Sequence, residues 1–222
     1  MIFGKGKESV SASTSFVHNY WASFVSFHSY PEVDSKNKGK RQVAGSCSTP
    51  NPSKVQVIWQ LPPLNYIKTN VDASFVESIS AASVGAVARD SSRRVIVSSH
   101  GISLDFVKSV EEAELRACIA GLYIGITLQN PIILETDCAF VVATLENENF
   151  DRSSLVDLKK EAMSISKLIS SLRISKINRS ANVMAHIIAK FSFDNRPDGI
   201  LVSGVPPCVV NFVMSDCNNY VG

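Results

Sequence analysis

The sequence predicts an α/β domain: a five-stranded mixed sheet, with three antiparallel strands plus two parallel ones, flanked by helices. The first observation is a run of three strand-like segments with turn residues between them. The second is that helical and strand patterns then alternate, which favours parallel strands joined through helices. The third is size and composition, because 222 residues of which 45% are hydrophobic can bury one core and still carry an extension.

The first three strand candidates predict an antiparallel meander. Residues 66–75 alternate in polarity with a period of two, which predicts one buried face and a second face with polar groups towards its C-terminal end. Residues 83–89 and 94–102 follow, and the four residues 90–93 between them, Asp-Ser-Ser-Arg, have the composition of a turn.

The rest of the domain is predicted as two strands and four helices. Ser109 is expected to cap a helix that runs to about Gln129, because acidic residues follow in its first turn. Pro131 ends this helix, and residues 132–137 are predicted to form a buried strand. The remaining predicted elements are a helix at 139–146, a helix from Ser153 whose apolar stripe continues to Leu172, a strand at 173–179 and a helix at 182–191.

Two segments are predicted to precede the folded domain, which we place at residues 57–222. Residues 1–30 form an N-terminal extension, in which aromatic side chains at helical spacing predict an amphipathic helix that docks on the domain or binds a protein partner. A membrane role is disfavoured because the polar face has no Lys or Arg. Residues 31–56 are a basic linker rich in Pro and Ser, whose cations are either solvated, in contact with phosphate or a nuclear address.

Charge, cysteines and hydropathy narrow the protein class. No apolar run reaches the roughly 18 residues of a membrane span and no signal-peptide core opens the chain, so we expect an intracellular protein, nuclear or cytoplasmic, with no membrane partner. The five cysteines have no CxxC spacing and are expected to be free thiols. The net charge is +2 overall but −2 for residues 61–222, which weighs against strong non-specific nucleic-acid binding by the folded part and leaves room for metal-dependent contact.

Three acids lie on three different predicted elements. Asp72 belongs to the first strand, Glu114 to the apolar stripe of the first long helix, and Asp137 to the end of the fourth strand. If the first and fourth strands are parallel neighbours, the three carboxylates converge at one end of the sheet. Convergent carboxylates repel one another, so such a cluster predicts a bound divalent cation or raised pKa values. Taken singly, each acid is equally typical of a surface or ion-paired group.

Five motifs in order carry a family resemblance: NVDASF, GAVARD, EEAELRACIAGL, ILETDC and RSANVMAHIIAK. With them, residues from about 57 to 215 resemble the RNase H family, and more closely the plant RNase H-like domains related to the reverse transcriptases of non-LTR retroelements. By this resemblance Asp72, Glu114 and Asp137 would be metal ligands. The family's fourth acidic position falls on His186, four residues after Asn182.

The resemblance implies a metal-dependent endonuclease that hydrolyses the RNA strand of RNA/DNA hybrids with two Mg²⁺ or Mn²⁺ ions. Asp72 would bridge the ions, Asp137 and His186 would complete one site, and Glu114 would complete the other and contact a 2′-hydroxyl. A monomer is expected. Predicted supporting residues are Asn70, Ser74 and Asn182 around the ligands, with Lys68 and Arg89 as nucleic-acid contacts or, alternatively, solvated charges of an edge strand.

His186 departs from the family pattern. Imidazole suits Mn²⁺ better than Mg²⁺, so His186 is either a weaker metal ligand or a structural histidine. The asparagines with which type 1 enzymes contact RNA 2′-hydroxyls are replaced by Val110, Glu111 and Glu112, the loop before the last helix lacks a histidine, and no basic handle helix follows Glu146. The resemblance therefore implies weaker or different hybrid recognition.

Two other functions stay open at this point. The first is a catalytically weak or inactive RNase H-like module that binds nucleic acid or protein. Against it, unpaired buried carboxylates cost stability, which is a reason for a vestigial site to lose them. The second is an unrelated α/β fold with a small-molecule site, which the absence of a Gly-rich phosphate loop disfavours.

Overall fold

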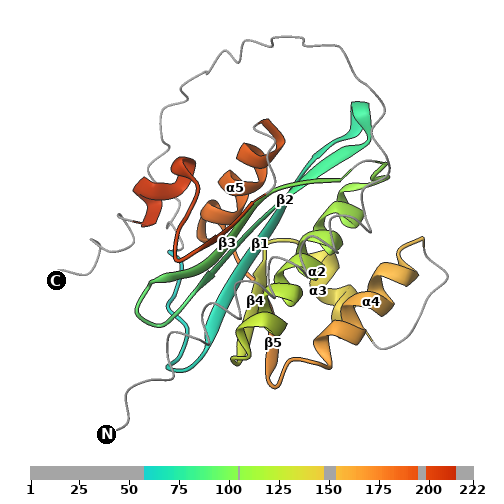
Figure 1. The fold of residues 1–222 in the computed structure, drawn as a ribbon. Helices are drawn as coiled ribbons and strands as arrows, with labels where there is room; N and C mark the ends of the chain where they lie inside the picture. The colour runs from blue at the N-terminus through green and yellow to red at the C-terminus, as the bar shows by residue number, and fades with distance from the viewer. Residues whose placement is uncertain (1–57, 105, 148–153, 195–198, 214–222) are drawn as a thin grey trace, which may run out of the picture.

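The computed structural model describes residues 58–104, 106–147, 154–194 and 199–213. This part of the chain forms a mixed sheet with α2, α3 and α4 on one face and α5 on the other (Figure 1). The strands are β1 (Ile67–Val76), β2 (Ala81–Arg89), β3 (Val95–Leu104), β4 (Ile132–Thr136), β5 (Leu172–Lys176) and β6 (Gly199–Val202). The helices are α2 (Val110–Leu128), α3 (Ala139–Glu146), α4 (Val156–Ser166) and α5 (Val183–Asp194), with the 3₁₀ turns η1 (Glu77–Ile79), η2 (Arg179–Ala181) and η3 (Pro207–Val209).

The central strand β1 makes both kinds of pairing. The order across the sheet is β5-β4-β1-β2-β3-β6, in which β1 runs antiparallel to β2 and parallel to β4. Strand β5 adds a second parallel pairing to β4. The predicted antiparallel meander, the two parallel strands and the flanking helices are therefore confirmed.

Strand β6 is a sixth strand that the sequence pattern did not predict. It pairs antiparallel with β3, from Val97 opposite Val202 to His100 opposite Gly199. Its four residues are too few to show a period of two in the sequence. Its position follows from its pairing with the outer edge of β3.

Both faces of β1 are buried, whereas the alternation predicted one buried face. Residues 67–72 are all buried. On one face a Cβ at Gly121 of α2 would lie 2.6 Å from side-chain atoms of Val71 and Leu134. On the other, Gly85 is the register partner of Asp72, and a Cβ there would lie 2.4 Å from the backbone of α5. Asp72 therefore lies on the face that α5 covers.

Helix α4 is shorter than predicted. It ends at Ser166, and Leu172 opens β5 instead of closing the helix stripe; Ser153 lies outside the described residues. The Oγ atoms of Ser164 and Ser166 donate to the carbonyls four residues earlier, and Leu168 N–H then bonds the carbonyl three residues before it. Serine hydroxyls that compete for backbone carbonyls weaken a helix, so this one ends in a tighter turn.

The predicted strand at 173–179 also ends early. Strand β5 stops at Lys176, and η2 occupies part of the connection to α5. Residues 177–182 therefore form that connection, of which the sequence analysis had assigned 177–179 to the strand and Asn182 to the helix.

The predicted N-terminal helix and basic linker lie outside the described residues, so the domain boundary at residue 57 stays a prediction. Within the described ranges, the helices lack the combination of length and apolar character that crossing a membrane would require.

Gly85→Ala is expected to destabilise the protein by about 1–3 kcal/mol, the usual effect of overpacking a core. A Cβ at Gly85 would meet backbone atoms of Ala185 and Ala189 that cannot move without shifting α5. Urea unfolding would measure the loss. Gly204→Ala is the matched control, because a Cβ there meets nothing nearer than 3.8 Å. Equal unfolding midpoints for the two variants would contradict the expected close packing of α5.

Candidate active site

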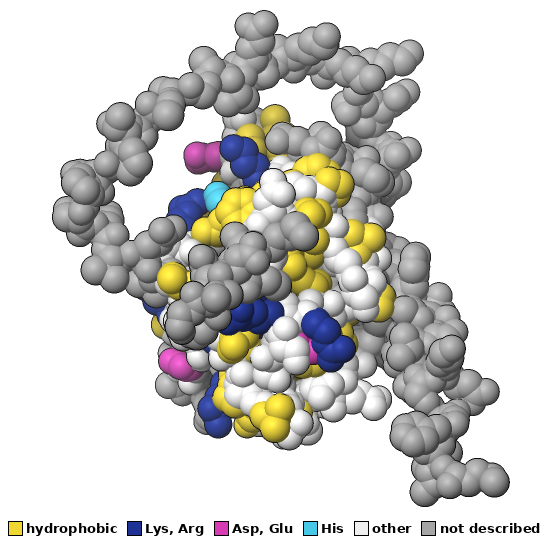
Figure 2. Space-filling model, turned by 90° about the vertical axis from the view of Figure 1, so that its left-hand side faces the viewer, with side chains coloured by type: hydrophobic (Ala, Val, Ile, Leu, Met, Phe, Trp, Pro, Cys, Tyr) yellow, Lys and Arg dark blue, Asp and Glu magenta, His cyan; other side chains and the backbone are white. Residues whose placement is uncertain are grey.

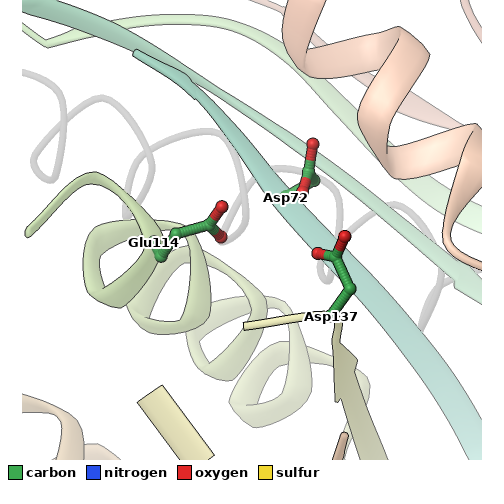
Figure 3. A group of neighbouring side chains, drawn as sticks. All are labelled: Asp72, Glu114 and Asp137. Carbon is green, nitrogen blue, oxygen red and sulfur yellow. The ribbon is translucent and has the colours of Figure 1, made fainter. Parts of the chain in front are cut away.

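Three carboxylates from distant parts of the chain meet beside the central strand (Figure 3). Asp72 comes from β1, Glu114 from the second turn of α2, and Asp137 directly follows β4. One oxygen of each lies within 4.8 Å of the others. Asp72 and Glu114 are buried and Asp137 is half-buried. The structure therefore brings together the three acids that the sequence placed on separate elements.

The early end of β4 lets Glu114 approach Asp72. Strand β4 pairs with β1 only as far as Glu135 opposite Asn70, whereas β1 continues to Val76. Beyond Asn70 no described strand covers this edge of β1. The carboxylate of Glu114 lies in this gap and accepts a hydrogen bond from the backbone of Ala73.

Local contacts at the start of α2 set the position of Glu114. The Ser109 Oγ accepts a hydrogen bond from Glu112 N–H at 3.2 Å, and the Glu112 Oε2 accepts one from Lys108 N–H at 3.0 Å. This reciprocal arrangement satisfies backbone donors at the helix end. It confirms the predicted cap at Ser109, five residues before Glu114.

No Lys or Arg among the described residues forms an ion pair with the three carboxylates. Burial raises the pKa of Glu114 to about 8, and the negative charges of Asp72 and Asp137 add to that shift. Burial also raises the pKa of Asp72 to about 6, although a hydrogen bond with His186 acts in the opposite direction. The Oε2 atom of Glu114 is buried and has no hydrogen-bond partner among the described residues. Protons or a cation would relieve this arrangement.

His186 contacts Asp72 and lies outside the group of three. Its Nδ1 is 2.8 Å from Oδ2 of Asp72, and its Nε2 is 3.4 Å from Nη2 of Arg179. The predicted fourth-ligand position is therefore next to the carboxylates, but its imidazole is hydrogen-bonded to one of them.

Asn182 joins two parts of the site. Its Nδ2 donates to the Val71 carbonyl at 2.9 Å and lies 3.4 Å from Oδ1 of Asp137, while its own Oδ1 is buried with no described partner. Asn182 thus lies beside Asp137, one of the three carboxylates. Asn70 does not contact Asp72, since its side chain bonds to Glu135 and Arg89.

Ser74 occupies the position two residues beyond Asp72 on β1, half-buried and opposite Ser83 in the ladder with β2. Its expected role in orienting Asp72 stays a prediction.

The expected positions of Lys68 and Arg89 need correction, because both side chains are buried inside the domain. Lys68 Nζ lies 2.7 Å from Oε1 of Glu135 and donates to the Gln60 carbonyl. The Arg89 guanidinium lies 3.4 Å from the ring centroid of Trp59. Neither cation is a solvated edge-strand charge, since β1 and β2 are interior strands, and the described contacts of both are with protein groups.

Glu135 is the centre of this buried network, which the sequence analysis missed. Its Oε2 accepts hydrogen bonds from Trp59 Nε1 at 3.1 Å and Asn70 Nδ2 at 2.9 Å, and Asn70 Oδ1 accepts one from Arg89. A signal was present, because Lys68 and Glu135 are opposite charges on two predicted strands, of which the one with Glu135 was predicted to be buried. The network ties the residues before β1 to the sheet.

Glu135→Gln is expected to cost about 3–5 kcal/mol, because it leaves the buried ammonium of Lys68 without its anion. The free energy of unfolding in urea measures the effect. Glu77→Gln, at an exposed position in η1, is the control and should change stability by less than about 0.5 kcal/mol. A similarly small effect at Glu135 would show that the network is not stabilising.

Without metal, the protein is expected to lose stability as pH rises from about 4 to about 8. The pKa values of Asp72 and Glu114 are raised to about 6 and about 8 from 3.8 and 4.5, so the folded state binds more protons than the unfolded state in this window. Glu114→Gln should flatten the loss above about pH 6, measured by urea unfolding in EDTA. The exposed Glu146→Gln should keep the wild-type slope. An unchanged slope for Glu114→Gln would contradict the raised pKa.

Solved structures of bacterial and archaeal enzymes share this fold. RNase H1 from the archaeon Halobacterium salinarum aligns with a TM-score of 0.53 at 19% identity, over 58% of this chain and 98% of the other. An RNase H domain from Mycobacterium tuberculosis, fused to maltose-binding protein, gives 0.50 at 20% identity, over 56% and 96%. LC11-RNase H1, isolated from compost, gives 0.51 at 17% identity, over 59% and 97%. At these identities they show the fold alone.

Sequence comparison identifies the family. No curated protein matches the chain. The model of the family described as reverse transcriptase-like matches residues 70–192, which is more than half of the chain and includes all three carboxylates. The chain therefore belongs to the reverse transcriptase-like family of RNase H-like domains.

Proposed function

We propose that this protein is a metal-dependent endonuclease that hydrolyses the RNA strand of RNA/DNA hybrids. The observation that carries the proposal is the group formed by Asp72, Glu114 and Asp137 within 4.8 Å. The RNase H-like fold suggests nucleic-acid hydrolysis, and the acidic group is consistent with divalent metal use.

The residues present fit a hard divalent cation. All three side chains offer carboxylate oxygens, the donors that Mg²⁺ prefers and Mn²⁺ accepts. The buried Oε2 of Glu114 has no described partner, and the raised pKa values of Glu114 and Asp72 reflect uncompensated burial and charge. We propose that Asp72, Glu114 and Asp137, together with the His186 position, would hold two such ions.

When bound, such ions supply an activated water and stabilise the leaving 3′-oxygen. The protein's own residues would hold the carboxylates in position. Asn182 holds Asp137 against β1 through the Val71 carbonyl, and Glu114 would contact the 2′-hydroxyl of the nucleotide. The close packing of α2 on β1 at Gly121 keeps Glu114 on the open edge of the strand.

His186 is expected to limit the activity. Its imidazole is a poorer ligand for Mg²⁺ than a carboxylate, which favours Mn²⁺ over Mg²⁺. Its Nδ1 is also hydrogen-bonded to Oδ2 of Asp72, a contact that would compete with any cation at that oxygen.

The same hydrogen bond supports a second candidate, a catalytically weak or inactive RNase H-like module that binds nucleic acid or protein. In that case the imidazole of His186 would hold Asp72 in place of a metal. Val110, Glu111 and Glu112 also offer no amide groups for 2′-hydroxyls. In either case we propose an intracellular monomer, with the predicted N-terminal helix as the contact for any protein partner.

The deciding experiment is cleavage of a labelled RNA/DNA hybrid in Mg²⁺ and in Mn²⁺. Asp72→Asn is expected to reduce the rate at least about 100-fold, the order of effect when one electrostatic stabiliser is lost. His186→Asp should raise the Mg²⁺-dependent rate by supplying a harder ligand. Asp157→Asn, whose side chain is 92% exposed on α4, is the matched control and should cleave like the wild type.

Hydrolysis that survives Asp72→Asn would rule out the proposed site. If neither metal supports cleavage and His186→Asp restores none, the binding module becomes the better description.

A further inference from the structure

Arg179 is an exposed cation next to the three carboxylates. It is the first residue of η2, and its Nη2 lies 3.4 Å from Nε2 of His186. The other ring nitrogen, Nδ1, lies 2.8 Å from Oδ2 of Asp72. A line of three side chains therefore runs from the candidate active site to a guanidinium at the surface.

The hydrogen-bonding capacity of Arg179 and Asp72 indicates which ring nitrogen of His186 carries the proton. Arginine only donates hydrogen bonds, and an ionised carboxylate only accepts them. A neutral imidazole with its proton on Nδ1 donates to Asp72 and accepts from Arg179 at Nε2. This tautomer satisfies both contacts of His186.

Backbone contacts fix the position of Arg179. The Oδ1 atom of Asn178 accepts hydrogen bonds from Ser180 N–H at 3.0 Å and Ser180 Oγ at 3.1 Å. The Arg179 carbonyl accepts one from Asn182 N–H at 3.0 Å. The base of the Arg179 side chain is thus set by the same turn that places Asn182.

Arg179 acts on the carboxylates at a distance without pairing to them. Burial and the two neighbouring acids raise the pKa of Glu114, and the charge of Arg179 acts in the opposite direction. Its guanidinium nevertheless forms no ion pair with a carboxylate in the part of the chain that the structure describes. Among the described residues, the contact of its guanidinium is with His186, and a guanidinium has five N–H donors.

Other cations on this side of the sheet differ in their surroundings. Lys68 is paired with Glu135, and Arg89 is buried against Trp59, whereas Lys190 is exposed on α5, four residues after His186. On the side of the molecule shown in Figure 2, Lys and Arg side chains are scattered rather than gathered into one basic surface. Arg179 is distinguished by its contact with His186, which itself contacts Asp72.

We propose that Arg179 binds a phosphate of the nucleic-acid backbone at the candidate active site, and that His186 is a positioning residue that holds the Arg179 guanidinium. A planar guanidinium suits phosphate oxygens because it can donate two parallel hydrogen bonds. This rests on the proposed function, since nucleic acid is taken as the ligand. In this arrangement both ring nitrogens of His186 are engaged, so its role toward Arg179 replaces the metal-ligand role proposed above for this position. An acid there would pair with Arg179 and neutralise its charge.

The test measures the binding of an RNA/DNA hybrid in EDTA at a series of salt concentrations, with fluorescence anisotropy as the readout. Arg179→Ala should weaken binding about 10-fold, the order expected for a charge-assisted hydrogen bond. It should also reduce the slope of log K against log salt by about 0.9, the effect of one lost phosphate contact. A merely structural role would not change this slope. Arg179→Lys should keep the slope and lose part of the affinity.

Lys160→Ala is the matched control, because it removes one positive charge from α4, on the other face of the sheet. Its affinity and slope should equal those of the wild type. An Arg179→Ala variant that behaves like Lys160→Ala would overturn the proposal.

A double-mutant cycle tests the role of His186. His186→Ala should weaken hybrid binding in the wild type but add little to Arg179→Ala, since both remove the same contact. Additive effects would overturn the positioning role. His186→Asp should lower hybrid affinity even where it raises Mg²⁺-dependent cleavage.

Binding and cleavage separate this proposal from the nuclease proposal. A wild-type protein that cleaves nothing but shows the Arg179 slope change supports the phosphate contact and contradicts the nuclease. If the wild type cleaves the hybrid and the Arg179→Ala variant binds it as the wild type does, the nuclease proposal is supported and the phosphate contact is contradicted. A wild type that binds no hybrid overturns the phosphate contact.

Discussion

Mutual repulsion among three partly buried carboxylates is the constraint on which the rest of this domain depends. In water Asp72, Glu114 and Asp137 would ionise separately, but the fold places their oxygens within 4.8 Å and shields two of them. Only rigid packing can hold such a group. Helix α2 is pressed onto β1 and β4 at Gly121, and α5 onto β2 at Gly85. The domain thus accepts a local loss of stability where its chemistry is proposed, as stability–function trade-offs at active sites predict.

Strands β1 and β4 also carry a second group of buried polar side chains, and this group includes a cation. Asn70 and Glu135 precede Asp72 and Asp137 by two residues each, on the same sheet face, and Glu135 has Lys68, Trp59 and Asn70 as partners. One step along the strands, no Lys or Arg among the described residues pairs with the three carboxylates. The contrast separates a buried acid with a cation as partner from the acids that are proposed to hold metal, and it depends on their partners rather than on burial alone.

The parts of this structure that were predictable are those specified by local pattern. Asp72 interrupts a strand pattern, Asp137 ends one and Glu114 interrupts an apolar helix stripe, so each stood out within its own segment. The partners of Lys68 and Arg89 depend on strand register and on the return of Trp59 to the sheet, which no local period records. The spacing from Asn182 placed His186 near the site, but its bond to Asp72 depends on the close approach of α5. Strand β6 is too short to have a pattern.

The pairing of β6 with β3 has a consequence for the order in which the domain is assembled. The buried residues of the hydrophobic cluster beneath α2 end at Ile169 in the sequence, whereas the smaller cluster beneath α5 joins Val87 and Ile188 to Val209. On a chain that emerges from the ribosome N-terminus first, the layer of α2 with Glu114 can therefore form before the layer of α5 with His186. Closing β3 with β6 spans about a hundred residues, a non-local contact of the kind that slows folding. The face of β1 that carries Asp72 thus stays uncovered on the growing chain until α5 has been synthesised and packs on it.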